Sequence, residues 1–213
     1  MHRTCEPAIL YFGTPVVLIS TVNEDGSYNL APMSSAWWLG WRCLLGLAAA
    51  SQTPQNMLRT RECVLNLPSV AQVAAVNRLA KTTGTETVPA VKLRRGYRFV
   101  RDKFGLAGLT PDPSEIVAAP RVCECPVQLE ATVEAVYRFA ENDPAGRGRQ
   151  IAFEMRIRCA HIDEAILVDG EPNRIDPDKW RPLIMSFQKF YGLTPDQLHP
   201  STLAEIPEAL YRA

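Results

Sequence analysis

The stretch from residue 16 to residue 31 constrains the fold more than any other part of the sequence. Val16–Val22 is a run of apolar and β-branched residues, which predicts a strand. Asn23–Gly26 follows with turn-forming residues, and Ser27–Ala31 returns as the second arm of a hairpin. Pro32 is expected to end the pairing, because proline cannot donate to a strand ladder. This hairpin favours an antiparallel, mainly β fold.

Further segments have the apolar or alternating pattern of strands, and they are Arg42–Ala48, Glu62–Leu67, Cys125–Tyr137, Ile151–Ile162 and Ala165–Val168. Most of them are joined by short polar connections, which are typical of hairpins. The sequence therefore predicts a closed antiparallel barrel with helices inserted or appended.

Four segments have helical features. Thr53 and Pro54 are expected to supply the N-cap and the first position of a short helix. A second helix is predicted to start at Ser69, a third candidate lies around Phe99–Phe104, and a fourth covers Trp180–Tyr191.

Composition excludes some classes of function. Lys plus Arg equals Asp plus Glu at 23 each in 213 residues, so the chain has no general attraction to nucleic acid or anionic membranes. No apolar run reaches the roughly 18 residues of a membrane span. The first residues do not have the pattern of a secretory signal, and the six cysteines are thinly spread. We therefore expect a cytoplasmic protein with reduced thiols.

Cys123 and Cys125 form the only close cysteine pair. On a strand, both side chains would face the same way, an arrangement that suits a soft metal. No second pair or nearby histidine completes four ligands, so we expect a structural role and no metal site.

Two segments have features of a ligand site. At 51–56, a core strand runs into a helix start whose free N–H groups, hydroxyls and Asn56 amide suit a phosphate. At 31–37, small hydroxylated residues leave a strand, where the backbone can approach a planar ligand. Each segment alone is better explained locally, since Thr53 can merely cap the helix and 31–37 can be a polar turn.

Ordered motifs add to these two segments. They are Pro15–Val22, Asp25–Gly26, Asn29–Ser35, Ser51–Asn56, Cys63–Pro68, Val76–Arg78, Lys81–Gly84, Asp102–Phe104, Gly108–Thr110 and Glu124–Glu130. In this order and spacing, over roughly residues 8 to 170, the chain resembles the flavin reductase-like family, whose fold is the FMN-binding split barrel.

The resemblance implies a mainly β protein with added helices, built as an FMN-binding split β-barrel of the Greek-key antiparallel type. It implies one domain over residues 1–213, with a barrel core at about 8–170 and a C-terminal helical extension at 171–213. It also implies a homodimer with FMN at or near the subunit interface.

The same resemblance implies residue roles. The isoalloxazine ring would contact the segment Met33, Ser34, Ser35, Ala36 and Trp37. The ribityl phosphate would be held by Ser51, Gln52, Thr53 and Asn56. Lys81 and Lys103 would neutralise a phosphate or pyrophosphate, the alternative being that each is a solvated lysine. Trp37 or Trp38 would wall the ring, or pack in the core or the dimer.

From 81 to 120 the pattern loosens into a long excursion, and such loops are often functional. It contains one dense basic run of Lys92, Arg94, Arg95, Arg98 and Arg101. The run suits the 2′-phosphate of NADPH, although a solvated loop face is the more ordinary interpretation.

Motifs for nicotinamide binding are weak. Gly146-Arg-Gly148 lacks the third glycine and the strand context of a dinucleotide fold. Many such reductases carry a Gly-Asp-His near the penultimate barrel strand, whereas Gly146–Gln150 has no histidine. His161 comes later and is expected to face structure or solvent.

The resulting hypothesis is an NAD(P)H-dependent flavin reductase that passes hydride to FMN, with no catalytic side chain and with NADH or NADPH as donor. Its reduced flavin would serve a partner monooxygenase. The alternative is a non-turnover FMN-bound electron carrier or flavin-binding module, which the missing histidine favours. A weaker third possibility is a deazaflavin or haem occupant, since a fold alone cannot choose its ligand.

Overall fold

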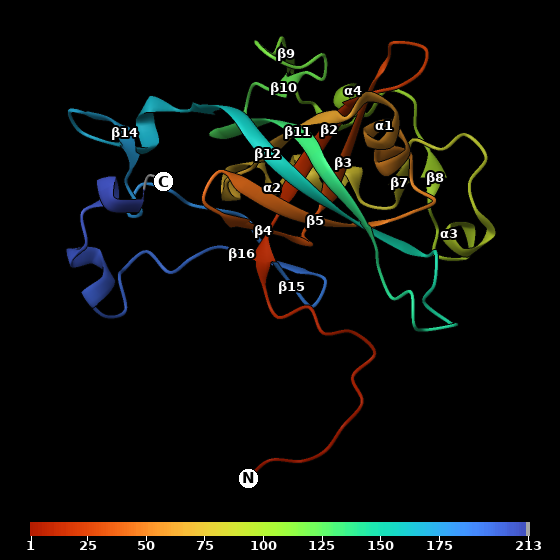
Figure 1. Cartoon of the computed structure of the whole chain (residues 1–213), viewed down its shortest axis with the longest axis horizontal. Coiled ribbons are helices and arrows are strands. Elements are labelled where there is room, and N and C mark those ends of the chain that lie inside the picture. Colours follow the sequence, from red (N-terminus) through yellow and green to blue (C-terminus); the bar gives the residue numbers. More distant parts are fainter. Residues whose placement is uncertain (212–213) are drawn as a thin grey trace.

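A seven-stranded antiparallel sheet organises the computed structural model, which describes residues 1–211 (Figure 1). Its strand order is β3-β2-β6-β11-β12-β5-β4. The strands are β2 (Val17–Val22), β3 (Tyr28–Met33), β4 (Ala36–Leu39), β5 (Arg42–Ala48), β6 (Glu62–Leu67), β11 (Val127–Arg138) and β12 (Gln150–Ile162). The prediction of a mainly β fold is confirmed.

The hairpin predicted from residue 16 onward is present as β2 and β3, with Val22 opposite Tyr28 and Gly26 in the turn at a φ of 79°. Pro32 does not end the pairing, contrary to expectation, because it lies opposite Leu18 within the ladder. β3 is an edge strand of this sheet, so along one edge it has no neighbouring strand that would need the N–H that proline lacks.

The sheet curls because its two edge strands are neighbours in the chain. Only Ser34 and Ser35 separate β3 from β4. Three peptide steps span at most about 11 Å, so the edges must meet at this end. Pairing between β3 and β4 is not recorded for residues 1–211. Closure into a complete Greek-key barrel therefore stays a prediction.

Two apolar cores lie on opposite sides of β2. Val17 and Ile19 point into the curled sheet, where they pack with Leu65, Phe153 and Met155. The residue between them, Leu18, points to the opposite face of the sheet, as the two-residue period of a strand requires. That outer core joins Leu18 and Leu30 to the helices, through Val76, Leu79, Phe104 and Ala107.

Four short α-helices cover the sheet: α1 (Gln52–Thr60), α2 (Val73–Leu79), α3 (Ala90–Arg94) and α4 (Lys103–Ala107). Ser69 caps a 3₁₀ turn, η1 (Val70–Gln72), that leads into α2. The excursion from 81 to 120 also holds β7 (Thr82–Thr83), β8 (Arg98–Phe99), β9 (Pro111–Asp112) and β10 (Arg121–Val122).

Two predicted helix boundaries are wrong. The N-cap of α1 is Ser51 rather than Thr53, and Pro54 lies at the third helical position. The first turn has no intrahelical donor to lose, so proline fits there as well. The candidate around Phe99–Phe104 divides into the end of β8 and the start of α4, which Asp102 caps.

The predicted helix over Trp180–Tyr191 is also wrong. The segment forms a hairpin of β15 (Ile184–Ser186) and β16 (Lys189–Tyr191), and β15 pairs with β1 (Thr14–Pro15). Phe187 and Gln188 make the turn with φ values of 44° and 66°, which a helix does not allow. Pairing with a distant strand therefore decides this segment.

The remaining C-terminal elements are η2 (Glu164–Ile166), β13 (Leu167–Val168), β14 (Glu171–Ile175), η3 (Thr202–Glu205) and η4 (Glu208–Tyr211). Only the last two residues of the strand predicted at Ala165–Val168 are extended. The first residues and the C-terminal segment project from the body in separate directions (Figure 1). Within residues 1–211, no helix is long and apolar enough to cross a membrane.

Cys123 and Cys125 do not share a face as predicted. They lie in a turn after β10, where Cys123 is exposed and Cys125 is buried.

Candidate functional site

A polar cluster lies at the start of α1, where β5 ends. Ser51 caps the helix by its backbone alone, because its side chain makes no capping hydrogen bond. The first turn contains no acidic residue, so the positive end of the helix is not neutralised locally. This end of the helix is suited to an anion.

Lys103, from α4, is the buried cation of the cluster. Its side chain is 3% exposed, and its Nζ donates to Oδ1 of Asn29 over 3.0 Å. No carboxylate pairs with it among residues 1–211. Burial, and then the charge of Lys92, lower the pKa of Lys103 to about 8. A buried ammonium without an anion is costly, so this site is suited to a negative ligand.

Lys92 enters the cluster from α3. Its Nζ lies 3.0 Å from Oγ of Ser51 and 3.4 Å from Oγ1 of Thr83, and it lies 5.7 Å from the ring centre of Tyr97. Burial lowers the pKa of Lys92 as well. Two ammonium groups therefore converge on one small region without a described counter-ion.

Some hydroxyl groups of the cluster do not donate a hydrogen bond within the described residues. Ser51 accepts from Lys92, and Thr53 accepts from Nδ2 of Asn29 over 3.0 Å, but neither hydroxyl donates to a described residue. Oγ1 of Thr85 is buried and has no hydrogen-bond partner within residues 1–211. A hydroxyl both donates and accepts, so Ser51 and Thr53 each keep a donor available for a bound oxyanion.

Gly84 brings the backbone close to the cluster. A Cβ atom at this position would lie 2.5 Å from Oδ1 of Asn29 and 3.1 Å from the side chain of Gln52. Only glycine fits there without moving its neighbours.

Asn56 and Gln52 lie in the same region, but Asn56 is bonded within the protein. Its Nδ2 donates to Thr21 and to Asn23, and its Oδ1 accepts from Nε2 of Gln52 over 2.9 Å. Asn56 is 1% exposed, so this network fixes α1 against β2.

The segment predicted for the ring forms the junction of β3 and β4. Met33 ends β3 against the inner core, and Ala36 is buried. The carbonyl of Ser34 accepts from Thr14, and that of Ser35 accepts from the backbone N–H of Gly46 over 2.8 Å. Trp37 is 56% exposed. β5 therefore connects the ring segment directly to the polar cluster.

The structure separates the two lysines named from the sequence. Lys103 lies in the cluster, whereas Lys81 is exposed and its side chain lies beside Gly96. In the basic run, Lys92 points into the cluster, and Arg94, Arg95 and Arg98 are exposed. Arg101 pairs with Asp25 over 2.5 Å.

Sequence reasoning missed the parts of the site contributed by Asn29, Thr83, Thr85 and the side chain of Lys92. The motifs Asn29–Ser35 and Lys81–Gly84 contained or bordered most of these residues. Their convergence depends on long-range packing, which no local pattern reveals.

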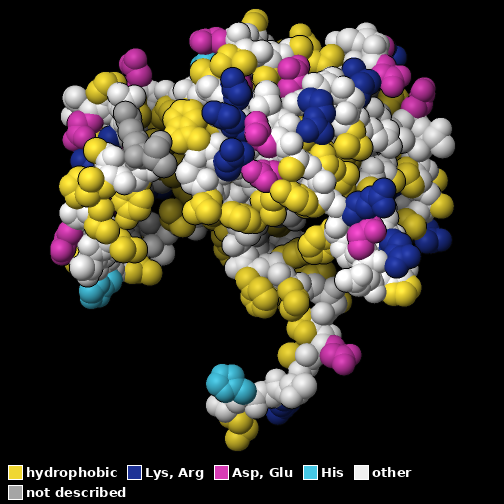
Figure 2. All heavy atoms as spheres, in the orientation of Figure 1, with side chains coloured by type: hydrophobic (Ala, Val, Ile, Leu, Met, Phe, Trp, Pro, Cys, Tyr) yellow, Lys and Arg dark blue, Asp and Glu magenta, His cyan; other side chains and the backbone are white. Residues whose placement is uncertain are grey.

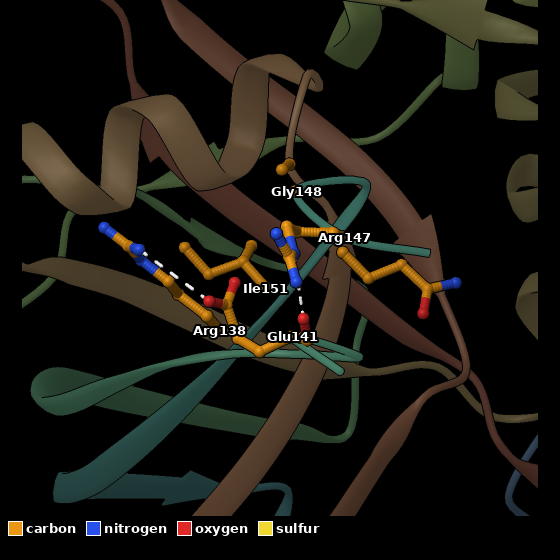
Figure 3. A pocket seen from close by; sticks show the side chains of 7 residues that line it. Arg138, Glu141, Arg147, Gly148 and Ile151 are labelled. Atoms are coloured by element: carbon orange, nitrogen blue, oxygen red, sulfur yellow. Dashed lines mark hydrogen bonds and ion pairs between the residues drawn. The ribbon is translucent and has the colours of Figure 1, made fainter. Parts of the chain in front are cut away.

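A hollow lies beside Ala49, at the end of β5, against the loop that joins β11 to β12 (Figure 3). It encloses about 260 Å³ and is lined by Ala49, Arg138, Glu141, Arg147, Gly148, Gln150 and Ile151. Nε of Arg147 donates to the carbonyl of Glu141 over 2.8 Å, and the carboxylate of Glu141 lies 3.9 Å from Arg138. The loop without the expected histidine therefore forms one wall of this hollow.

Comparison with known proteins assigns the family. Residues 9–193 match the model of the flavin reductase like domain. The chain belongs to the flavin reductase-like family. It is 37% identical over 191 residues to protein YdfE of Bacillus subtilis (strain 168), a match that covers 90% of this chain and 89% of that protein.

Solved structures support the fold. Flavoredoxin of Desulfovibrio vulgaris (Miyazaki F) aligns with a TM-score of 0.74 and 22% identity, over 97% of this chain and all of that one. Nitrilotriacetate monooxygenase component B from Bacillus cereus aligns at 0.70 and 20%, over 91% and 89%. A split barrel domain protein of Shewanella frigidimarina aligns at 0.67 and 18%, over 89% and 87%. This flavin reductase-like chain therefore shares its fold with split-barrel flavoproteins.

Proposed function

We propose that this flavin reductase-like protein binds FMN, with the phosphate of FMN in the polar cluster at the start of α1. The observation that carries the proposal is the buried ammonium of Lys103, which has one hydrogen bond and no described anion. A phosphate would complete its bonding and that of Lys92, Ser51 and Thr53. A phosphate of this kind is dianionic near neutral pH, which matches two converging lysines.

The ring of FMN would lie on the junction of β3 and β4, where Met33, Ser34, Ser35, Ala36 and Trp37 line the path from β5. The main-chain N–H groups and hydroxyls of this junction suit the polar edge of a planar ligand. Gly46 lets β5 pack closely against Ser35 of this junction, because a Cβ atom at position 46 would lie 3.4 Å from Cβ of Ser35.

FMN is preferred to FAD for a structural reason. The cluster is walled by Gly84, Gln52 and Asn29, and Lys103 at its centre is almost completely buried. A terminal phosphate fits such a closed end. The pyrophosphate of FAD continues to an adenosine, so FAD would need an opening at this end of the site. A titration in which FAD bound more tightly than FMN would contradict this preference.

We propose further that the protein is an NAD(P)H-dependent flavin reductase. Bound FMN would supply the redox chemistry by accepting a hydride from reduced nicotinamide. The chain itself would fix the phosphate and align the ring, and it needs no side chain that gives or takes a proton. The hollow beside Ala49 lies next to the proposed site and offers Arg147 and Arg138 to an anionic donor, although both already contact Glu141.

Anaerobic mixing of the FMN complex with NADH or NADPH tests this function. We expect the flavin absorption band to bleach with at least one donor. Failure to form an FMN complex would contradict the binding proposal itself. A complex whose band persists with both donors would contradict turnover and leave the alternative, an electron carrier or flavin-binding module, which the missing histidine in the 146–150 loop supports.

We also propose a homodimer, because β4 and the turn after it expose large apolar side chains. Trp37, Leu39 and Trp41 are 56%, 75% and 62% exposed, respectively. Figure 2 shows hydrophobic side chains gathered on the lower side of the body, where Figure 1 places β4, β15 and β16. Large apolar patches of this kind mark interaction surfaces. A second copy of the chain would bury them beside the ring segment.

A monooxygenase that receives reduced flavin is the partner we propose for the reductase. The similarity to a structure named as a monooxygenase component supports this choice. Reduced flavin released by the protein should sustain such an oxygenase in a coupled assay.

A further inference from the structure

A second cluster of reactive side chains lies on β11 and β12, outside the proposed flavin site. Cys159 and His161 are two residues apart on β12, so they share a face of the strand. Glu130 on β11 is the direct cross-strand partner of Cys159. Strand alternation and register therefore bring a thiol, an imidazole and a carboxylate together.

The three potential ligand atoms are close enough to share one ion. Nε2 of His161 lies 2.7 Å from Oε1 of Glu130 and 3.5 Å from Sγ of Cys159. All three atoms lie within 4.8 Å of one another. Zinc bonds of about 2.3 Å to sulfur and 2.0 Å to nitrogen at a tetrahedral angle separate those two atoms by about 3.5 Å. The sulfur–nitrogen distance already fits, whereas the 2.7 Å between Nε2 of His161 and Oε1 of Glu130 must widen to about 3.4 Å when zinc replaces their hydrogen bond.

We propose that Glu130, Cys159 and His161 form a site for Zn²⁺ or a similar divalent cation. Thiolate, imidazole and carboxylate are the ligand types that zinc takes in proteins. Cys159 and His161 are partly exposed, so an ion can reach the cluster from solvent and take water as its fourth ligand.

The surroundings hold the ligands in place. The carboxylate of Glu130 is fully buried and accepts from the backbone N–H groups of Glu115, Ile116 and Val117. Oε1 of Glu115 lies 4.0 Å from Nδ1 of His161, on the side of the ring away from the cluster. Metal-binding histidines commonly direct their second nitrogen to a carboxylate, which orients the ring.

Proton release accompanies binding. The Cys159 thiol gives its proton to solvent as it becomes a thiolate. Arg121 is the nearby cation, and it is already paired with Asp112 over 2.6 Å.

Metal titration of the full-length protein tests the site. After treatment with a chelator and removal of flavin, we expect one Zn²⁺ per chain by equilibrium dialysis. Bound Co²⁺ should give the near-ultraviolet absorption of a thiolate complex. Cys159→Ser should weaken zinc at least tenfold and abolish that absorption, and it should leave FMN affinity unchanged. Cys123→Ser, at an exposed cysteine outside the cluster, is the matched control.

Two results would overturn the proposal. One is the absence of stoichiometric zinc at pH 8. The other is equal zinc affinity in Cys159→Ser and the unchanged protein. His161→Gln serves as a second variant that keeps a polar group beside Glu130, and it too should lose zinc. A failure here leaves the flavin proposal intact, because the two sites share no residue.

Discussion

Lys103 is a residue whose burial favours function over stability. Its pKa of about 8 lies below the ordinary lysine value, mainly because burial disfavours the charge. Below pH 8 the group is charged in both the folded and the unfolded states, so the folded state bears the full cost of desolvation. That cost corresponds to roughly 3 kcal/mol and is relieved as the pH rises from about 8 toward the unfolded value.

Lys103→Met should therefore change stability and binding in opposite directions. We expect a higher melting temperature for the flavin-free protein at pH 7, since the buried charge is gone, and weaker FMN binding by at least tenfold. Calorimetry and flavin titration measure the two effects. A variant that lost both stability and binding would assign Lys103 a structural role instead.

The pH dependence of FMN affinity follows from the same group. Between pH 7 and pH 9 the free Lys103 loses its proton, and FMN must restore it on binding. The dissociation constant of FMN should increase by up to about tenfold over this range. Riboflavin lacks the phosphate and should show no such trend. Parallel curves for the two ligands would contradict contact between Lys103 and the phosphate.

Thr53 tests the hydroxyl donors. Thr53→Val removes the free hydroxyl proton and should weaken FMN about tenfold, in line with roughly 1.5 kcal/mol for a hydrogen bond to a charged group. Riboflavin should be almost unaffected. Thr60→Val, at the other end of α1, is the matched control, because its hydroxyl bonds to the carbonyl of Asn56. Equal losses for both flavins would contradict the assignment.

At the scale of elements, α3 shows how a basic loop is divided. The basic run looks uniform in the sequence, yet among its five cations only Lys92 contacts Ser51. Lys92→Met should reduce FMN affinity several-fold, whereas Lys81→Met should not, because Lys81 is exposed beside Gly96. Fluorescence titration compares them. A larger effect at Lys81 would restore the role that the sequence suggests for it.

The elements also show what sequence can predict. Strands β2, β5, β6, β11 and β12 carry apolar patterns strong enough to be located from the sequence. The start of α1 is also predicted, to within two residues. The hairpin β15–β16 could not be found, because its pairing with β1 joins positions about 170 residues apart. The position of the Lys92 side chain was missed for the same reason, since only the packing of the 81–107 segment places it beside Ser51.

At the scale of the whole molecule, the proposed homodimer would make the flavin site depend on assembly through the apolar face of β4. The double variant Leu39→Glu with Trp41→Glu should shift the protein to a monomer and weaken FMN, because charge on both sides of the interface opposes pairing. Light scattering measures the mass. Ile116→Glu, at a residue that is 53% exposed on the loop between β9 and β10, should stay dimeric. An unchanged mass in the double variant would place the interface elsewhere.

Equilibrium titration of the flavin-free protein with FMN and with riboflavin tests the central claim most directly. We predict saturable quenching of FMN fluorescence at one flavin per chain, with riboflavin at least a hundredfold weaker and inorganic phosphate competing with FMN. Binding of riboflavin as tightly as FMN, or no binding of FMN at all, would contradict a phosphate site at Lys103 and Ser51.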